Sequence, residues 1–252
     1  MEVFKDYATY YDAFYGDKDY ASEAKTVSKM IKDYRQDAQT VLNFGCGTGK
    51  HDMELCKLGY LCHGVDISSE MIRIANENSA NIDGVSFEVG DIRHYHSESK
   101  YDAVISLFHV MSYQNSNADI INTLKSVRNA MVDGGVFIFD FWYGPGVLTD
   151  PPVVRVKEAV TEKYRLIRIA RPIIHDDTNV VDVNYEVIIT DKNGNTSSLR
   201  ETHNMRYFFK PELEYYLNEC GIKMIKMIDG SGEGDISFDS WTSYCIAILD
   251  QM

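Results

Sequence analysis

Apolar and polar positions follow two different periods along residues 40–142. Short apolar runs of the strand type are separated by stretches in which apolar residues recur every three or four positions, as on one face of a helix. Strands are predicted at 40–45, 61–67, 85–91, 101–110 and 136–142, and helices at 48–59, 68–80 and 117–135. Strand and helix therefore alternate, which indicates a doubly wound α/β fold with helices on both faces of a parallel sheet.

The pattern changes after residue 142. No helical period is present from 153 to 209, and strand-like runs occur instead, with Asn193-Gly194 as a typical hairpin turn. These runs are 153–161, 164–174, 180–190 and 198–209. A helix with Pro211 in its first turn and two last strands, 222–228 and 242–249, follow. We therefore expect a mostly parallel seven-stranded sheet carrying a small antiparallel β insert.

These patterns divide the chain into four segments. Residues 1–39 form an aromatic N-terminal segment with a helix at 17–35, and residues 40–142 form the α/β core. Residues 143–209 form the insert, and residues 210–252 supply the last helix and strands of the core.

Composition limits the classes of partner. The 252 residues carry a formal net charge of −13, which argues against a phosphate backbone as the main ligand. The five cysteines are odd in number and form no C-x-x-C pair, which is typical of a reduced, cytoplasmic protein. No leader pattern and no apolar run of about 20 residues is present, so neither secretion nor a membrane span is expected.

The stretch "VLNFGCGTGK" places Gly45, Gly47 and Gly49 between the first strand and its helix. In an open parallel sheet, ligands bind at the carboxyl ends of the strands, where a glycine lets the backbone come close to them. Dinucleotide-binding folds use G-x-G-x-x-G, but here the third glycine comes one residue early and Lys50 takes the dinucleotide position.

Two acidic residues follow the loop at the ends of the next two strands. Asp66 ends "HGVDIS", where a carboxylate can accept both hydroxyls of a ribose. Asp91 ends the third strand in "VGDIR". Each residue alone also suits a helix cap or a turn, but a glycine loop followed by two acids in this order is more specific than any one of them.

The G-x-G-x-G spacing resembles motif I of the class I S-adenosylmethionine (SAM)-dependent methyltransferases. Together with "YDAFYGDKDYASEA", "GVDISSEM", "GDIR", "DAVISLF" and "DFWYGP", it makes nearly the whole chain resemble the sugar-nucleotide N-methyltransferases and their small-molecule relatives. The resemblance implies a Rossmann-like methyltransferase fold, SAM as methyl donor and S-adenosylhomocysteine as product. It also implies a small-molecule acceptor, with the amine of an amino sugar as the first candidate.

The resemblance further implies that the N-terminal segment closes over the cofactor and that Asp91 and Ile92 meet the adenine. Tyr7, Tyr11 and Tyr15 are spaced four apart, so they share one face of a helix and are candidate lid contacts, with plain packing as the alternative. The candidate cofactor-binding residues are Tyr7, Tyr15, Gly45, Cys46, Gly47, Gly49, Asp66, Ile67, Met71, Asp91, Ile92, Leu107 and Phe108.

Candidate catalytic residues lie after the fourth strand, in "LFHVMSYQ". His109 is a candidate general base and Tyr113 a candidate hydrogen-bond partner of the acceptor, with Tyr11 from the lid. An amine can also lose its proton to solvent without a base. The two histidines in "HYH" at 94–96 lack a third ligand in pattern and predict no metal site.

Two departures from the family pattern keep alternatives open. Asn43 stands where many class I enzymes have an acid, which leaves a non-catalytic SAM-binding protein as one alternative. The acidic loop 229–235 does not suit a diphosphate, so an unphosphorylated amine is another acceptor class. An NAD-dependent oxidoreductase is disfavoured by the glycine spacing. The free edge of the insert leaves a homodimer open.

Overall fold

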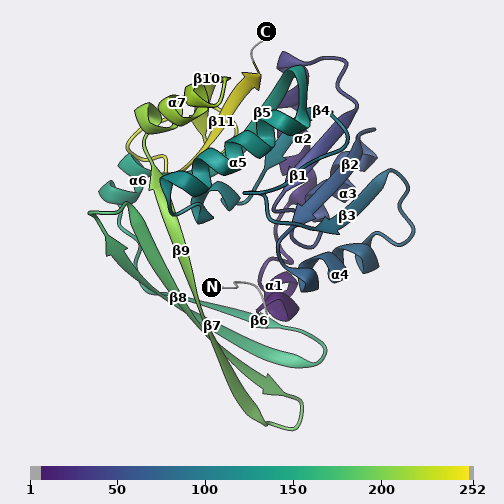
Figure 1. Ribbon diagram of the computed structural model, residues 1–252. Helices are drawn as coiled ribbons and strands as arrows, with labels where there is room; N and C mark the ends of the chain where they lie inside the picture. The colour runs from purple at the N-terminus through teal and green to yellow at the C-terminus, as the bar shows by residue number, and fades with distance from the viewer. Residues whose placement is uncertain (1–6, 250–252) are drawn as a thin grey trace.

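The computed structural model describes residues 7–249, so the first six residues of the N-terminal segment predicted at 1–39 lie outside the described residues. Seven strands form the core sheet in the order β3-β2-β1-β4-β5-β11-β10 (Figure 1). They are β1 (Thr40–Phe44), β2 (Leu61–Asp66), β3 (Val85–Val89), β4 (Tyr101–Ser106), β5 (Met131–Tyr143), β10 (Ile222–Asp229) and β11 (Thr242–Leu249). Strands β1 to β5 pair in parallel and β11 runs antiparallel to β5, which confirms the expected mostly parallel α/β fold.

Helices cover both faces of this sheet because successive strand residues point to opposite sides. Val41, Ile105 and Ile138 pack with α2 (Tyr20–Tyr34) and α3 (Lys50–Lys57). Leu42, Val104, Phe137 and Phe139 pack on the other face with α5 (Asn117–Ala130) and α7 (Lys210–Glu219). The remaining helices are α1 (Ala8–Phe14), α4 (Ser69–Asn78), α6 (Gly144–Thr149) and the 3-10 helix η1 (Val110–Tyr113).

The predicted ends of two elements were wrong. The strand expected at 101–110 ends at Ser106, and Val110 already belongs to η1 (Val110–Tyr113). The helix expected at 117–135 ends at Ala130, and Met131 already belongs to β5. Met131 pairs with Tyr101 of β4, and a register shift separates this pair from Ala103–Val136. Gly134 has a φ of 68°, so the glycines expected to end the helix instead form an irregular start of the strand.

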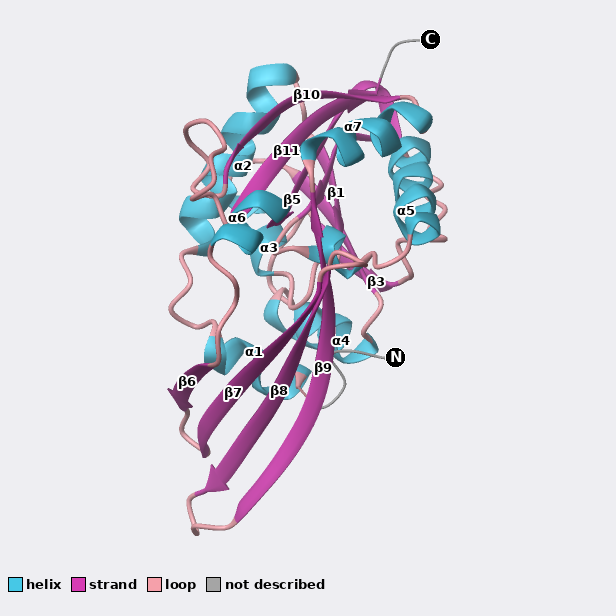
Figure 2. Ribbon diagram, turned by 90° about the vertical axis from the view of Figure 1, so that its left-hand side faces the viewer, coloured by secondary structure: helices cyan, strands magenta, loops and turns pink. Residues whose placement is uncertain are grey.

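The insert consists of four antiparallel strands, named here the insert sheet: β6 (Arg155–Val160), β7 (Tyr164–His175), β8 (Val180–Asp191) and β9 (Thr196–Phe208). Gly194 turns the β8–β9 hairpin, as its sequence predicts. Figure 2 shows these strands extending away from the core. Two residue pairs, Trp142–Tyr207 and Tyr143–Phe208, join β5 to β9 in parallel.

One face of the insert sheet covers α1. Leu166, Val187 and Ile189 pack in one cluster with Tyr7 and Phe14. Figure 1 shows α1 between the insert sheet and α4, and α1 contacts both β6 and α4. Helix α1 is therefore enclosed between the insert sheet and the core.

Candidate active site

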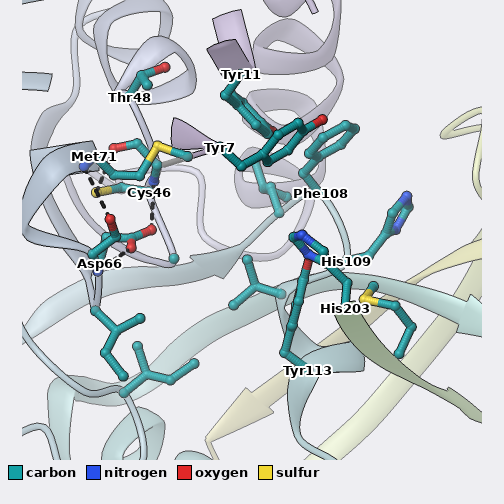
Figure 3. A pocket seen from close by; sticks show the side chains of 18 of the residues that line it. Tyr7, Tyr11, Cys46, Thr48, Asp66, Met71, Phe108, His109, Tyr113 and His203 are labelled. Carbon is teal, nitrogen blue, oxygen red and sulfur yellow. Dashed lines mark hydrogen bonds between the residues drawn. The ribbon is translucent and has the colours of Figure 1, made fainter. Parts of the chain in front are cut away.

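A large cavity opens at the carboxyl ends of the core strands, where α1 and the insert sheet cover them. Its volume is about 1140 Å³, which exceeds the roughly 300–1,000 Å³ typical of sites for one small ligand. Figure 3 shows Cys46, Asp66 and Met71 on one side of it and His109, Tyr113 and His203 on the other. We call these the glycine-loop side and the insert side.

The glycine loop contributes open space to the cavity at Gly47. Its φ is 55°, and a Cβ at this position would meet no atom within 4 Å. Gly49 differs, because a Cβ there would lie 2.4 Å from the Phe87 ring. Gly47 therefore leaves room for a ligand beside the backbone, whereas Gly49 lets α3 pack against β3 and does not line the cavity.

Asp66 lies at the end of β2 and fixes the loop. Its Oδ2 accepts from the Gly47 N–H at 2.9 Å and its Oδ1 accepts from the Ser68 N–H at 2.8 Å. Burial raises the pKa of this carboxyl, which these two backbone donors oppose. Two of about four lone-pair positions on the carboxylate are used in this way, so the others are available to a ligand's hydroxyls.

Asn43 is buried beneath the loop and outside the cavity lining. Its Nδ2 donates to Oδ2 of Asp52 on α3 at 2.7 Å. Burial raises the pKa of Asp52 from 3.8 to about 7. The first strand thus carries an amide at position 43, and a carboxyl on the following helix lies against it.

Asp91 and Ile92 line the cavity just after β3. Arg93 binds both carboxylate oxygens of Asp91, with Nη2 to Oδ2 at 2.7 Å. This pairing holds the pKa of Asp91 below its ordinary value. A ligand amino group would therefore share the carboxylate with Arg93.

The three lid tyrosines line the cavity from the ends and the middle of α1. Tyr7 and Tyr11 meet edge to face, with ring centroids 6.2 Å apart. Arg168 of β7 donates from Nη1 to the hydroxyls of Tyr7 and Tyr15 at 2.7 and 2.9 Å. The lid is thus tied to the insert sheet by a partly buried cation.

His109 lies on the insert side of the cavity, and its backbone conformation is unusual. Phe108 and His109 have φ values of 65° and 67°, a left-handed conformation that is costly for bulky residues. Asp140 of β5 holds this conformation, because its Oδ1 accepts from the His109 backbone N–H at 2.9 Å. Its Oδ2 lies 2.8 Å from Nδ1 of the ring. Burial would raise the pKa of Asp140, but His109 holds it below its ordinary value.

Tyr113 faces the insert side from η1. Its hydroxyl lies 2.7 Å from Nδ1 of His203 on β9, a residue for which the sequence suggested no role. Burial raises the pKa of Tyr113 well above its ordinary value, so this residue stays a neutral phenol at physiological pH.

All candidate site residues from the sequence line this cavity except Gly49. Sequence reasoning expected the insert to serve substrate binding or dimer contacts, but it named none of the insert residues that line the cavity, namely Val183, Tyr185, His203, Asn204 and Met205. Strand alternation places Tyr185, His203 and Met205 on one face, but only the folded chain shows that this face covers the cavity. Across residues 7–249, no group of three or more His, Cys, Asp or Glu could hold a metal ion. No helix in that range is long and apolar enough to cross a membrane.

Among known proteins, a family model matches part of this chain, and several relatives match over most of its length. Residues 41–135 match the family model described as "Methyltransferase domain". The chain is 23% identical over 232 residues to the dTDP-3-amino-3,4,6-trideoxy-alpha-D-glucopyranose N,N-dimethyltransferase of Streptomyces venezuelae, which covers 91% of this chain and 94% of that protein.

Two solved structures share the fold over the whole chain. An S-adenosylmethionine-dependent methyltransferase from Clostridium acetobutylicum has a TM-score of 0.83 at 18% identity, covering 99% of this chain and 100% of the other. SAM-bound CalS10 of Micromonospora echinaspora, an amino pentose methyltransferase, has a TM-score of 0.75 at 19% identity and covers 99% and 98%.

Proposed function

We propose that this chain, a SAM-dependent methyltransferase, transfers the methyl group to the amine of a small molecule and that an amino sugar is the first acceptor to test. The observation that carries the proposal is His109, which lines the cavity and is held in a strained conformation by Asp140. Strained residues of this kind concentrate at functional sites.

The glycine-loop side fits SAM. The open space at Gly47 admits a ligand close to the backbone, and the lone pairs of Asp66 suit ribose hydroxyls. SAM supplies a methyl group on a positively charged sulfur, which is displaced without further activation. The protein has to exclude water and orient the acceptor, and α1 closed under the insert sheet suits both tasks.

His109 is the proposed general base. The carboxylate beside Nδ1 favours a proton on that atom, which leaves the lone pair of Nε2 to take a proton from the acceptor amine. The side chain of His109 is partly exposed to the cavity, and Asp140 is buried behind it. Phe108 stacks on the His109 ring at 5.5 Å and supports its orientation.

A specific observation favours an acceptor without phosphate as the second candidate. The lysine and arginine that line the cavity are both paired with carboxylates, Lys50 with Asp12 at 2.9 Å and Arg93 with Asp91. Arg206 is bound by Glu212 and Asn117. Aromatic side chains instead line the insert side, including Trp142 and Tyr185, which suit the apolar face of a sugar ring.

The test is a transfer assay with three acceptors: a dTDP-linked amino sugar, the corresponding free amino sugar and glycine. We expect S-adenosylhomocysteine and a methylated amine with at least one of them. Transfer to the free sugar alone would establish the second candidate. SAM binding without transfer to any amine would contradict the proposed activity and support a non-catalytic SAM-binding protein.

We further propose a cytoplasmic homodimer that pairs through β6. All five cysteines are free thiols, which suits a reducing compartment. In the described part of the chain, β6 pairs with β7 alone, and Val154, Val156 and Val160 beside this edge are more than 60% exposed. Light scattering on Val156→Glu should give a monomer. A wild type that is already monomeric at micromolar concentration would contradict this proposal.

A further inference from the structure

Glu201 and His203 are neighbours on one face of the insert sheet. They are two residues apart on β9, so both side chains point to the same side of the strand. Their cross-strand partners, Tyr185 and Val183, line the cavity, as does His203. This face therefore places an imidazole in the cavity lining, with a carboxylate next to it on the same strand.

Glu201, His203 and Tyr113 form a chain of short side-chain contacts. Oε1 of Glu201 lies 3.2 Å from Nε2 of His203, and Nδ1 of His203 lies 2.7 Å from the Tyr113 hydroxyl. The imidazole is only 2% exposed. The rings of Tyr185 and Tyr7 meet it edge-on, at 4.8 and 5.9 Å between centroids. The ring is thus held in place on several sides.

We propose that Glu201 and His203 are positioning residues that turn the Tyr113 hydroxyl into a hydrogen-bond acceptor for the N–H of the acceptor amine. The negative charge of Glu201, 3.2 Å from Nε2 but outside hydrogen-bond geometry, favours the imidazole proton on that nitrogen, so Nδ1 carries a lone pair. Tyr113 then donates its proton to Nδ1, and the lone pairs of the phenol oxygen face the cavity. An amine that donates an N–H to this oxygen is oriented for transfer, while His109 takes the proton.

This inference rests on the proposed amine methylation, and it assigns the insert sheet a role in acceptor selection. An acceptor presenting an N–H donor gains this contact. One presenting only a lone pair meets the lone pairs of the phenol oxygen and is disfavoured. The glycine-loop side takes no part in this contact, so cofactor affinity is independent of it.

A double-mutant cycle tests the inference with the amine that the wild-type enzyme methylates fastest. Tyr113→Phe and His203→Leu should each raise KM for the amine about tenfold, the loss of one hydrogen bond, and leave the Kd for S-adenosylhomocysteine unchanged. KM for the amine should rise no more in the double variant than in either single variant. His203→Asn, whose amide oxygen can accept from Tyr113, should recover most of the loss. Additive increases in KM in the double variant, or a wild-type KM in His203→Leu, would overturn the inference.

A second measurement does not depend on turnover. ¹⁵N NMR of histidine-labelled enzyme should show the His203 proton on Nε2, and Glu201→Leu should remove this preference. A proton on Nδ1 in the wild type would overturn the inference even if the amine is methylated. A wild type that methylates no amine would overturn the proposed function, and the tautomer would still decide the arrangement of the three residues.

Discussion

The glycine-loop side of the cavity comes from one continuous segment, residues 45–92, whereas the insert side gathers residues from 7–15, 107–114, 142 and 183–205. Backbone groups carry much of the first side: Asp66 accepts from two N–H groups, and Gly47 leaves open space. Side-chain contacts form the insert side instead: Tyr113 contacts His203, and Arg168 binds the lid tyrosines. Most of the proposed cofactor site is thus built locally, whereas the proposed acceptor site is built from distant parts of the chain.

The largest expected effect is on the insert side, at His109. His109→Gln should lower kcat by about 10²–10⁴-fold, because the proposed base is lost, and should leave the Kd for S-adenosylhomocysteine unchanged. His51→Gln is the matched control, since His51 also lines the cavity and pairs with a carboxylate, Glu23, at 2.7 Å. Steady-state kinetics separate the two variants. A fall in kcat of less than threefold would show that the amine loses its proton to solvent.

A large effect on stability is expected beneath the glycine loop. Burial raises the pKa of Asp52 to about 7, so between about pH 4 and 7 the folded protein keeps a proton that the unfolded chain has lost. The free energy of unfolding should therefore fall as pH rises through this range and be level above it. Asp52→Asn should remove this fall and stabilise the protein at pH 8 by up to about 4 kcal/mol.

Urea unfolding of Asp52→Asn and wild type at pH 5 and pH 8 measures this difference. An amide at position 52 can also donate to Oδ1 of Asn43, which has no hydrogen-bond partner among residues 7–249. The exposed Asp83→Asn serves as a control that should leave the pH dependence unchanged. The prediction would be refuted if the free energies of unfolding of wild type and Asp52→Asn differed by the same amount at pH 5 and pH 8.

A smaller effect, on cofactor affinity, is expected at Gly47, and it tests which side of the cavity binds the cofactor. Gly47→Ala should weaken S-adenosylhomocysteine binding roughly tenfold, about 1.4 kcal/mol, because its methyl group fills the open space beside the backbone. Gly59→Ala is the control for backbone strain, since Gly59 also has a positive φ and open space but lies outside the cavity. Calorimetry should show normal binding for Gly59→Ala. Equal affinities of the two variants would place the cofactor elsewhere.

The smallest effect concerns the lid. Arg168→Met removes the donor to the hydroxyls of Tyr7 and Tyr15, so we expect faster amide exchange in α1 and about a threefold to fivefold higher KM for the acceptor. Arg165→Met on the same strand is the control, because Arg165 pairs with Glu158 on the surface. Hydrogen exchange followed by mass spectrometry compares them. Unchanged exchange in α1 would show that packing alone holds the lid.

The same contrast explains what the sequence could predict. The alternation of strands and helices along the chain, the glycine loop and Asp66 can be read from short-range patterns. The fold class inferred from them is confirmed. Gly47 and Gly49 share a motif, but the Phe87 ring decides that only Gly47 faces the cavity, and no local pattern reports that ring. His203 acts through Tyr113, which is far away in sequence, so its role emerges only from packing.

The attachment of the insert sheet has a consequence for how such enzymes diversify. The insert departs after β5 and returns beside the end of the same strand through two residue pairs, Trp142–Tyr207 and Tyr143–Phe208. Its length and inward face can therefore be exchanged between relatives at one junction, while the rest of the sheet keeps its register. A chimera that carries a relative's residues 144–206 would be a direct route to a new acceptor range with the original cofactor chemistry.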